Sequence, residues 1–210
     1  MADWVTISGL ATAGGTLVLA AATFSAVRSA NRSARIAEQA LQEQRRPVLV
    51  HGRLDDPMQK VMFADGHWIR VEGSEAVIDE DDGVVYLGLA VRNVGAGLAV
   101  LQGWYPWTEL LRGAADHAPP EDFHRQGRDI YIAPGDIGMW QGALRDEDAE
   151  VRRGVAAARA ERRGFTVDLL YSDQVGGQRT ISRFGVTPGG DDRWLGSVGR
   201  HWNLDLAGPR

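Results

Sequence analysis

The chain has 210 residues, of which 24% are charged and 44% hydrophobic, and its formal net charge is −5 at pH 7. This composition is typical of a folded domain and excludes both wholesale disorder and a polytopic membrane protein. The small negative charge argues against nucleic-acid binding, which needs a concentrated basic surface. Cysteine is absent, which excludes disulfides, thiolate metal sites and a cysteine nucleophile.

The first element is an uncharged stretch from Trp4 to Val27, which lies between Asp3 and Arg28. At about 1.5 Å per residue, a helix of this length reaches across a hydrocarbon core of about 30 Å. Its Ser and Thr residues make it only moderately apolar, but their hydroxyls can bond to helix carbonyls. Residues 1–27 are therefore predicted to be a transmembrane anchor that contacts lipid through residues 4–27, with Trp4 at the interface.

A cleaved signal peptide is the main alternative for this segment. Such peptides begin with a basic leader and end at a small-residue cleavage site. Here the leader contains Asp3, and a helical pattern continues past Ala26 through Arg28. The anchor is therefore the preferred interpretation, and a buried core helix fits so long an uncharged run less well.

Arginines follow the uncharged stretch and indicate its orientation. They are Arg28, Arg32, Arg35, Arg45 and Arg46. Because basic residues gather on the cytoplasmic side of membrane helices, the domain that follows is predicted to face the cytoplasm at the cell membrane. Residues 28–46 are predicted to form a helical juxtamembrane stalk that ends before Pro47, with Arg28, Arg32 and Arg35 flanking the membrane near anionic headgroups.

Small residues recur at four-residue spacing in the predicted anchor. They are Gly9, Ala11, Ala13 and Gly15. This spacing lets two transmembrane helices approach closely, so the face is a candidate for self-association, although such pairs also arise by chance in an alanine-rich segment.

After Pro47 the pattern changes to short apolar or alternating runs bounded by Gly, Pro and Asp, which predict β-strands. The runs are 47–54, 59–65, 67–73, 84–93, 97–107, 129–135, 137–144, 165–173 and 178–186. One helix is predicted at 146–164, with Val151, Val155 and Ala158 as its apolar stripe and Gly164 as its stop. Residues 47–210 are therefore predicted to be a mainly β domain, an antiparallel β-sandwich of the immunoglobulin-like kind with one surface crossover helix.

The most distinctive segment is R-N-V-G-A-G-L-A-V at residues 92–100. Asn93, Gly95 and Gly97 are predicted to form a structural turn through left-handed backbone angles and side-chain hydrogen bonds. With Gly103 and Trp104 after it, the segment resembles a group of uncharacterised actinobacterial single-pass membrane proteins. They join an N-terminal helix and an arginine-rich stalk to a strand-rich domain. The resemblance implies this architecture and brings no activity with it.

Candidate sites in the domain are few. Trp104, Tyr105 and Trp107 crowd at the end of a predicted strand and are candidates for a protein-binding patch, or for a plug at the end of the sandwich. The five histidines have no metal-ligand spacing, although His51, His67 and His201 could converge in space with Asp55 or Asp65. Nine acids lie between residues 55 and 82, and the I-D-E-D-D-G stretch at residues 78–83 is interpreted as a solvated acidic loop rather than a calcium site. No catalytic residue, metal or cofactor is predicted, because nucleophile and phosphate-binding motifs are absent.

The leading functional hypothesis is a membrane-tethered protein-interaction module that faces the cytoplasm. One alternative is an enzyme without a sequence signature that uses Asp and His residues of the domain, brought together by folding. Another is a structural subunit of a membrane assembly whose helix is the contact surface. The sequence indicates no nucleic-acid partner.

Overall fold

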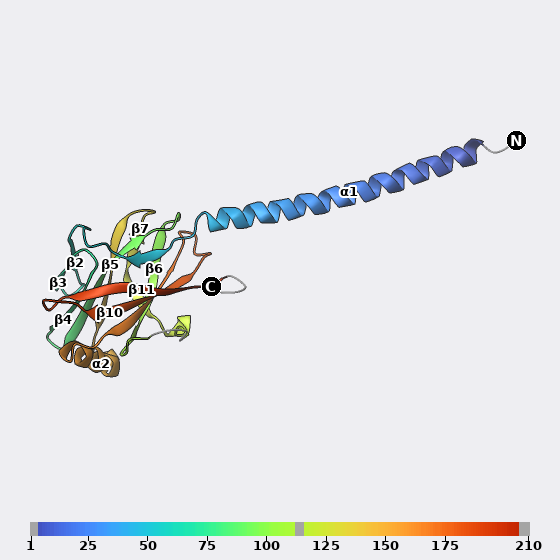
Figure 1. Cartoon of the computed structure of the whole chain (residues 1–210). Helices are drawn as coiled ribbons and strands as arrows, with labels where there is room; N and C mark the ends of the chain where they lie inside the picture. The colour runs from blue at the N-terminus through green and yellow to red at the C-terminus, as the bar shows by residue number, and fades with distance from the viewer. Residues whose placement is uncertain (1–3, 112–115, 206–210) are drawn as a thin grey trace. The chain divides into compact units, whose positions relative to one another are not determined.

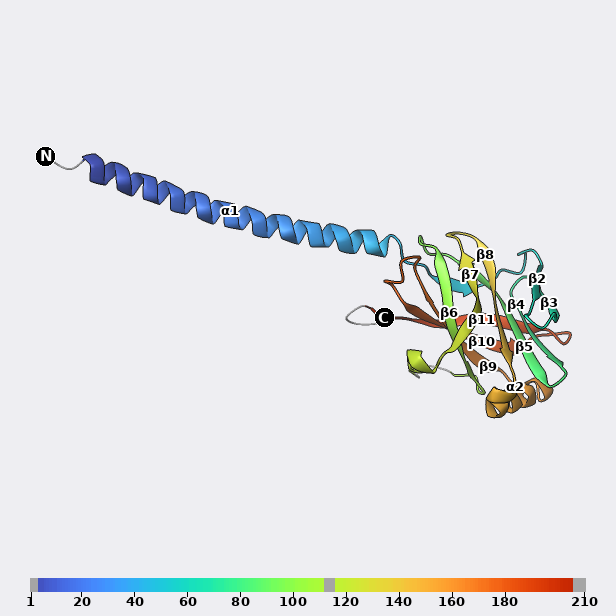
Figure 2. The same cartoon turned by 180° about the vertical axis from the view of Figure 1, so that it is seen from behind.

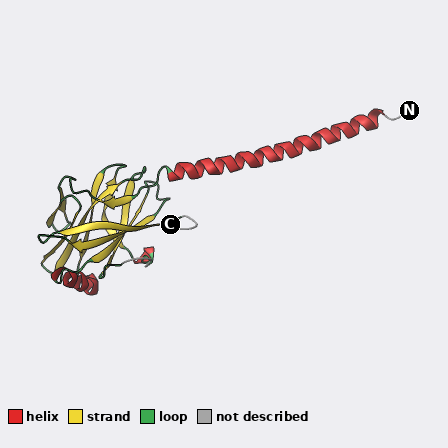
Figure 3. Ribbon diagram, in the orientation of Figure 1, coloured by secondary structure: helices red, strands yellow, loops and turns green. Residues whose placement is uncertain are grey.

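The computed structural model describes residues 4–111 and 116–205 (Figure 1). It divides the chain into two compact units, Met1–Gln44 and Arg45–Arg210, which are described separately. The first unit contains one long helix, whereas strands dominate the second (Figure 3).

Helix α1 (Trp4–Glu43) is continuous through the boundary between the predicted anchor and the predicted stalk. Its described side chains, at residue 9 and residues 12–41, are all exposed. They include Leu17, Leu19 and Phe24, which are 71%, 70% and 70% exposed. The helix is therefore not stabilised by packing of those side chains within the chain.

Within the described residues, no helix is both long enough and apolar enough to cross a bilayer. The side chains of residues 4–8, 10 and 11, which include Trp4 and Ala11, lie outside the described ones. In the described part of the predicted anchor, glycines and threonines at 12 and 14–16 dilute the apolar residues, and Arg28 ends the run. The prediction of a transmembrane helix is not confirmed, and membrane attachment stays a prediction.

The second unit contains eleven strands among the residues described. They are β1 (Leu49–His51), β2 (Gln59–Met62), β3 (Trp68–Val71), β4 (Glu75–Asp81), β5 (Val84–Asn93), β6 (Ala99–Trp107), β7 (His124–Ile132), β8 (Ile137–Leu144), β9 (Phe165–Ser172), β10 (Thr180–Pro188) and β11 (Trp194–Asn203). Each of the nine predicted runs overlaps one strand. Two short 3-10 helices, η1 (Pro120–Asp122) and η2 (Asp146–Asp148), and helix α2 (Ala149–Ala160) complete the unit.

Hydrogen bonds join nine of the strands into one antiparallel sheet in the order β1-β5-β4-β11-β10-β9-β6-β7, with β8 also paired to β5. Residues 85–89 of β5 pair with β4 on one side and β8 on the other, so the sheet runs from β8 to β7. The predicted class, mainly β with antiparallel strands, is confirmed. The sheet differs from an immunoglobulin-like pair of sheets, because its strands form one continuous ladder that curls around the core.

The sequence missed β4 and β11. Strand β4 lies in the acidic segment that was interpreted as a loop, but Ala76 and Ile78 on alternate positions are buried. Asp82 and Gly83 have φ angles of 45° and 73° and form a two-residue turn to β5, the hairpin geometry that an Asp-Gly pair favours. Asp79, Glu80 and Asp81 therefore lie in a strand, and Asp82 lies in the turn that follows it.

Helix α2 packs against one end of the curled sheet (Figures 1 and 2). Val155 and Ala158 are fully buried in the main core, as the apolar stripe predicted. The predicted stop at Gly164 is wrong. Arg162 has a φ of 52°, and the amide of Arg163 donates to the carbonyl of Ala158 at 2.8 Å, so a Schellman motif ends the helix earlier.

The β2–β3 hairpin forms a second layer outside the sheet. Val61, Phe63, Ile69 and Val71 pack against the outer faces of β4, β5 and β8 in a separate buried cluster that includes Tyr86. Strand β5 is consequently buried on both faces, which explains its nearly continuous apolar sequence.

The Asn93 segment is structural, as predicted, but its glycines serve another purpose. The Asn93 side chain is fully buried and accepts from the amides of Val48 and Gly95 at 3.2 and 3.0 Å. Its amide nitrogen donates to the carbonyls of Gly97 and Ile132 at 2.6 and 2.9 Å. Neither glycine has a positive φ.

Close backbone approach requires these glycines instead. A Cβ at Gly97 would lie 1.6 Å from the carbonyl oxygen of Arg45, and one at Gly95 would lie 2.4 Å from that of Arg46. The expectation of left-handed angles is therefore wrong, because the segment before β1 crosses directly over these residues.

Candidate functional site

The candidate site lies where the two ends of the curled sheet meet. Strands β7 and β8 follow one another in the chain, yet in the described structure β7 pairs only with β6, and β8 pairs only with β5. Figure 2 shows both strands on the same side of the unit. Each strand therefore presents one edge without a ladder partner, and the two edges face a common seam.

A bulge interrupts β7 beside the seam. The pairing of β6 with β7 shifts between Leu101 and Gly103, so residues 126–129 of β7 have no paired residues in β6. A bulge bends its strand and increases its local twist. The hairpin end of β7 is close to β8, where a Cβ at Gly138 would lie 2.7 Å from the side chain of Ile132.

A cleft of about 520 Å³ lies along the seam, beside residues 124–128 of β7. We call it the seam cleft. It is lined by residues 62–64 beside the β2–β3 hairpin, by Trp104, by residues 124–128 of β7, by Gln141 and Ala143 of β8, and by Arg145, Glu147 and Asp148.

Aromatic rings form one wall of the cleft. The His124 ring stacks on Trp104 with a centroid distance of 4.6 Å, and Trp104 meets Trp140 edge-on at 5.3 Å. Trp104 is only 4% exposed. His124 Nδ1 lies 3.6 Å from a carboxylate oxygen of Asp148, which helps to orient the half-exposed imidazole.

Two glutamines leave hydrogen-bonding capacity unused in the cleft. Gln126 Nε2 donates to the backbone carbonyl of Gln141 at 3.1 Å and bridges the seam. The side-chain oxygens of Gln126 and Gln141 are both buried with no partner among the described residues, and Gln141 is only 8% exposed. Buried acceptors of this kind are costly unless a donor reaches them.

An ion-pair network borders the cleft. Asp65 accepts from Arg145 Nη2 at 2.7 Å and from the Tyr86 hydroxyl at 2.8 Å. The hydrogen bond from Arg145 is the main reason that the pKa of Asp65 is lowered to about 2. Because its guanidinium pairs with Asp65, the Arg145 side chain is held in place at the edge of the seam cleft.

The three residues of the predicted aromatic patch lie on two different faces of β6. Trp104 faces the core and the seam cleft, whereas Tyr105 and Trp107 point to the opposite face of β6 and pack beside Phe123 and Leu170. Trp107 Nε1 donates to Asp168 at 2.9 Å, and Asp168 is also held by Arg183 at 2.7 Å in a fully buried ion pair. Only Trp104 contributes to the candidate site.

The histidines considered for a metal site do not converge. His67 stacks on Tyr86 at 3.9 Å and lies 3.0 Å from Asp79, whereas the His51 ring accepts from the amide of Val198. No cluster of three or more candidate metal ligands occurs among the residues searched, those that the structure describes.

A serine and a histidine do come together elsewhere. Ser182 Oγ lies 2.6 Å from His201 Nδ1 and 2.8 Å from the Tyr171 hydroxyl. Burial lowers the pKa of His201 and raises that of Tyr171. Ser182 is 0% exposed, so its hydroxyl is not accessible to a substrate. The network instead links β9, β10 and β11, and Tyr171 extends it to the amide of Leu49.

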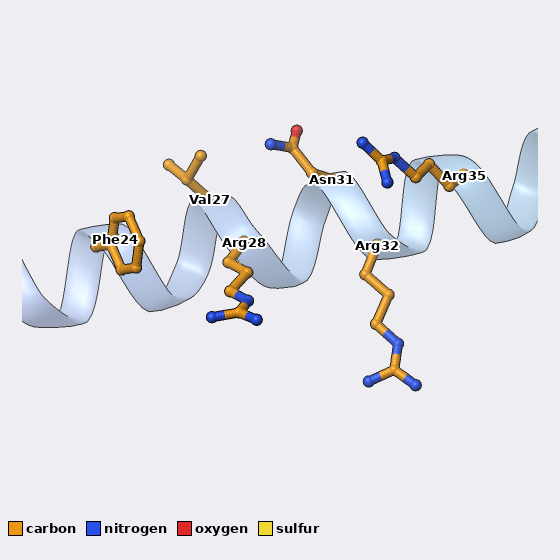
Figure 4. Close-up of a pocket in the computed structure, with 6 residues that line it drawn as sticks. All are labelled: Phe24, Val27, Arg28, Asn31, Arg32 and Arg35. Atoms are coloured by element: carbon orange, nitrogen blue, oxygen red, sulfur yellow. The ribbon is translucent and has the colours of Figure 1, made fainter.

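The predicted membrane-flanking arginines lie on α1. Figure 4 shows Arg28 and Arg32 on one side of the helix and Val27 and Asn31 on the other, with Phe24 one turn before Arg28. Together with Arg35 these side chains line a surface hollow of about 470 Å³. The small-residue face is described only in part: a Cβ added at Gly9 or at Gly15 would meet no atom within 4 Å, and Ala11 lies outside the described side chains.

Neither a family model nor a curated protein matches the chain. Among solved structures, it is similar to a protein from Archaeoglobus fulgidus, with 10% sequence identity and a TM-score of 0.24. The similarity covers 63% of this chain and 96% of that one. A likeness of this size supports neither a fold assignment nor a function, and the resemblance to actinobacterial membrane proteins stays a prediction.

Proposed function

We propose that this chain is a membrane-tethered protein-interaction module. In this proposal the apolar half of α1 enters the lipid, and the arginines that follow it contact the headgroups of the cytoplasmic leaflet. The β domain faces the cytoplasm and binds another protein.

The exposed apolar residues of α1 carry the proposal. Leu17, Leu19 and Phe24 are each at least 70% exposed, and they precede Arg28 and Arg32 within a few turns. Removing an aliphatic or aromatic side chain from water is worth about 1.5–3 kcal/mol. A lipid surface offers this gain, and each arginine near an anionic headgroup adds about 1 kcal/mol.

The seam cleft favours binding as the role of the domain. It combines two sheet edges without partners, a stacked aromatic wall and buried acceptors without donors. Free sheet edges are templates for another chain, and native proteins usually cover or charge them. An enzyme that uses Asp and His residues has no comparable support, because the Ser182 hydroxyl is inaccessible and the histidines are dispersed.

Flotation of the full-length chain with vesicles tests the tether. The chain is expected to float with vesicles that contain anionic lipid, and Leu19→Glu/Phe24→Glu is expected to abolish flotation. The matched control Leu54→Glu changes an exposed leucine of the domain, which is 83% exposed. Flotation of the double variant at the wild-type level would overturn the tether.

Crosslinking in native membranes tests the interaction. Loss of captured proteins on removal of residues 45–210 supports a module that binds through its domain. Loss on replacement of residues 4–27 by an unrelated transmembrane sequence, with the domain intact, would instead support a structural subunit that assembles through the helix.

A further inference from the structure

The seam cleft has the chemistry of a site for an extended peptide. Its walls are the edges of β7 and β8 that have no ladder partner among the described residues. An extended chain that lies between such edges gains main-chain hydrogen bonds without requiring a particular sequence.

The two glutamines specify what the ligand must donate. Both unpartnered side-chain oxygens are acceptors, so they call for N–H groups, and the backbone of an extended peptide presents an N–H at regular intervals. Gln141 lies on β8 and Gln126 on β7, on opposite sides of the seam. A peptide that enters between them can donate to both, and it replaces the single bridge from Gln126 to the Gln141 carbonyl.

Charge specifies the side chains of the ligand. Three arginines and two carboxylates line the cleft, although the chain as a whole has a net charge of −5. Arg145 is held by Asp65, and Asp148 is occupied by His124 and by the amide of Arg145. Among the described residues that line the cleft, Glu147 is therefore the one carboxylate left to oppose Arg125 and Arg128. Arg125 and Arg128 are exposed on β7, and no carboxylate of the described residues lies within ion-pair distance of either.

We propose that the seam cleft binds an extended acidic peptide segment of a partner protein, which adds as a strand between β7 and β8. Its backbone N–H groups donate to Gln126 and Gln141, and its carboxylates pair with Arg125 and Arg128. The inference rests on the proposed function and names the class of partner for its domain.

The test uses the isotope-labelled full-length chain in detergent micelles and the peptide Ac-Val-Glu-Val-Glu-Val-Glu-NH2 at up to about 1 mM, which detects even weak binding. The expected result is a set of amide shifts confined to the residues that line the cleft and their neighbours, which are 62–64, Trp104, 124–129 and 138–148. Two control peptides separate the contributions. One has Lys in place of Glu, and the other carries N-methyl groups at the Val residues, which removes alternate N–H donors.

Variants of the protein give the decisive comparison. Gln141→Leu and Arg125→Gln/Arg128→Gln are each expected to weaken binding about tenfold, the effect of one or two lost hydrogen bonds. The matched controls Gln174→Leu and Arg163→Gln lie outside the cleft and are expected to leave it unchanged. Thermal unfolding of each variant shows that the fold is kept.

Several outcomes would overturn the inference. These are no shifts at the highest concentration, shifts outside the seam, or equal binding of the N-methylated peptide. Equal shifts with inorganic phosphate alone would indicate a simple anion site instead. Crosslinked capture that persists in the Gln141→Leu/Arg125→Gln/Arg128→Gln variant would place the partner on another surface, and the interaction module itself would stand.

Discussion

Two leucines summarise the contrast between the two units of this chain. Leu19 of α1 is 70% exposed, whereas Leu89 of β5 is fully buried between β4 and β8. The helix satisfies its backbone hydrogen bonds locally, so it can form without burying any of its described side chains. The β domain forms its backbone hydrogen bonds between strands far apart in sequence, and its stability depends on the side-chain packing where those strands meet. Changes of the same chemical kind should therefore have very different effects in the two units.

The buried ion pair of the domain should give the largest effect. Arg183→Met leaves the carboxylate of Asp168 buried without its cation, which costs about 3–5 kcal/mol in the free energy of unfolding. The exposed Arg32→Met in α1 should change it by less than about 0.5 kcal/mol. Urea unfolding followed by tryptophan fluorescence measures both, and Arg183→Met/Asp168→Leu should recover part of the loss. A loss below about 1 kcal/mol in Arg183→Met would contradict the role given to the pair.

A glycine in each unit gives the next comparison. Gly97→Ala places a Cβ 1.6 Å from the Arg45 carbonyl, and the forced backbone shift should destabilise the domain by about 3 kcal/mol. Gly15→Ala meets no atom within 4 Å in α1 and should raise helix content, because alanine favours helix by about 1 kcal/mol. Circular dichroism during thermal unfolding distinguishes them. Equal melting temperatures for Gly97→Ala and the wild type would show that the crossing over Gly97 is looser than described.

The pH dependence of the domain should be smaller. Arg145 lowers the pKa of Asp65 from 3.8 to about 2, so the folded state favours the ionised carboxylate. The resulting stability is present above about pH 4 and is lost as the pH falls from about 4 to about 2. Since Asp65 is 31% exposed, screening reduces the contribution to about 1–2 kcal/mol. Asp65→Asn should remove this part of the acid transition in urea titrations at successive pH values, and an unchanged acid limb would contradict it.

The arginines of α1 should give the smallest effects, and only when lipid is present. Arg28→Gln, Arg32→Gln or Arg35→Gln should each weaken binding to anionic vesicles by about 1 kcal/mol, or about fivefold, without changing the unfolding of the domain. Vesicle sedimentation at low and high salt measures this, because salt screens the attraction. Binding of all three variants to anionic vesicles at the wild-type level would remove electrostatics from the proposed tether.

Local pattern accounts for what the sequence predicted well. The apolar runs at residues 165–173 and 84–93 placed β9 and β5, and the apolar stripe of Val151, Val155 and Ala158 placed α2. Strand β4 was not predicted, because its acidic residues are untypical of a strand that buries Ala76 and Ile78. The Asp-Gly pair at residues 82–83 is a hairpin signal that could have identified it. Most residues of the seam cleft were not predicted as site residues. Only Trp104 belongs to both the predicted patch and the seam cleft.

By itself, the sequence determined the division into an N-terminal helix and a mainly β domain, because helical and strand periodicity and turn chemistry are properties of neighbouring residues. Only the tertiary structure decided that one sheet curls until β7 faces β8. Only the structure also showed that Gly97 leaves room for the backbone of Arg45 to pass over it, and that Gln126 and Gln141 lie on opposite sides of a cleft. These features depend on which distant strands pair, and pairing is selected by the packing of the whole core rather than by any local run of residues.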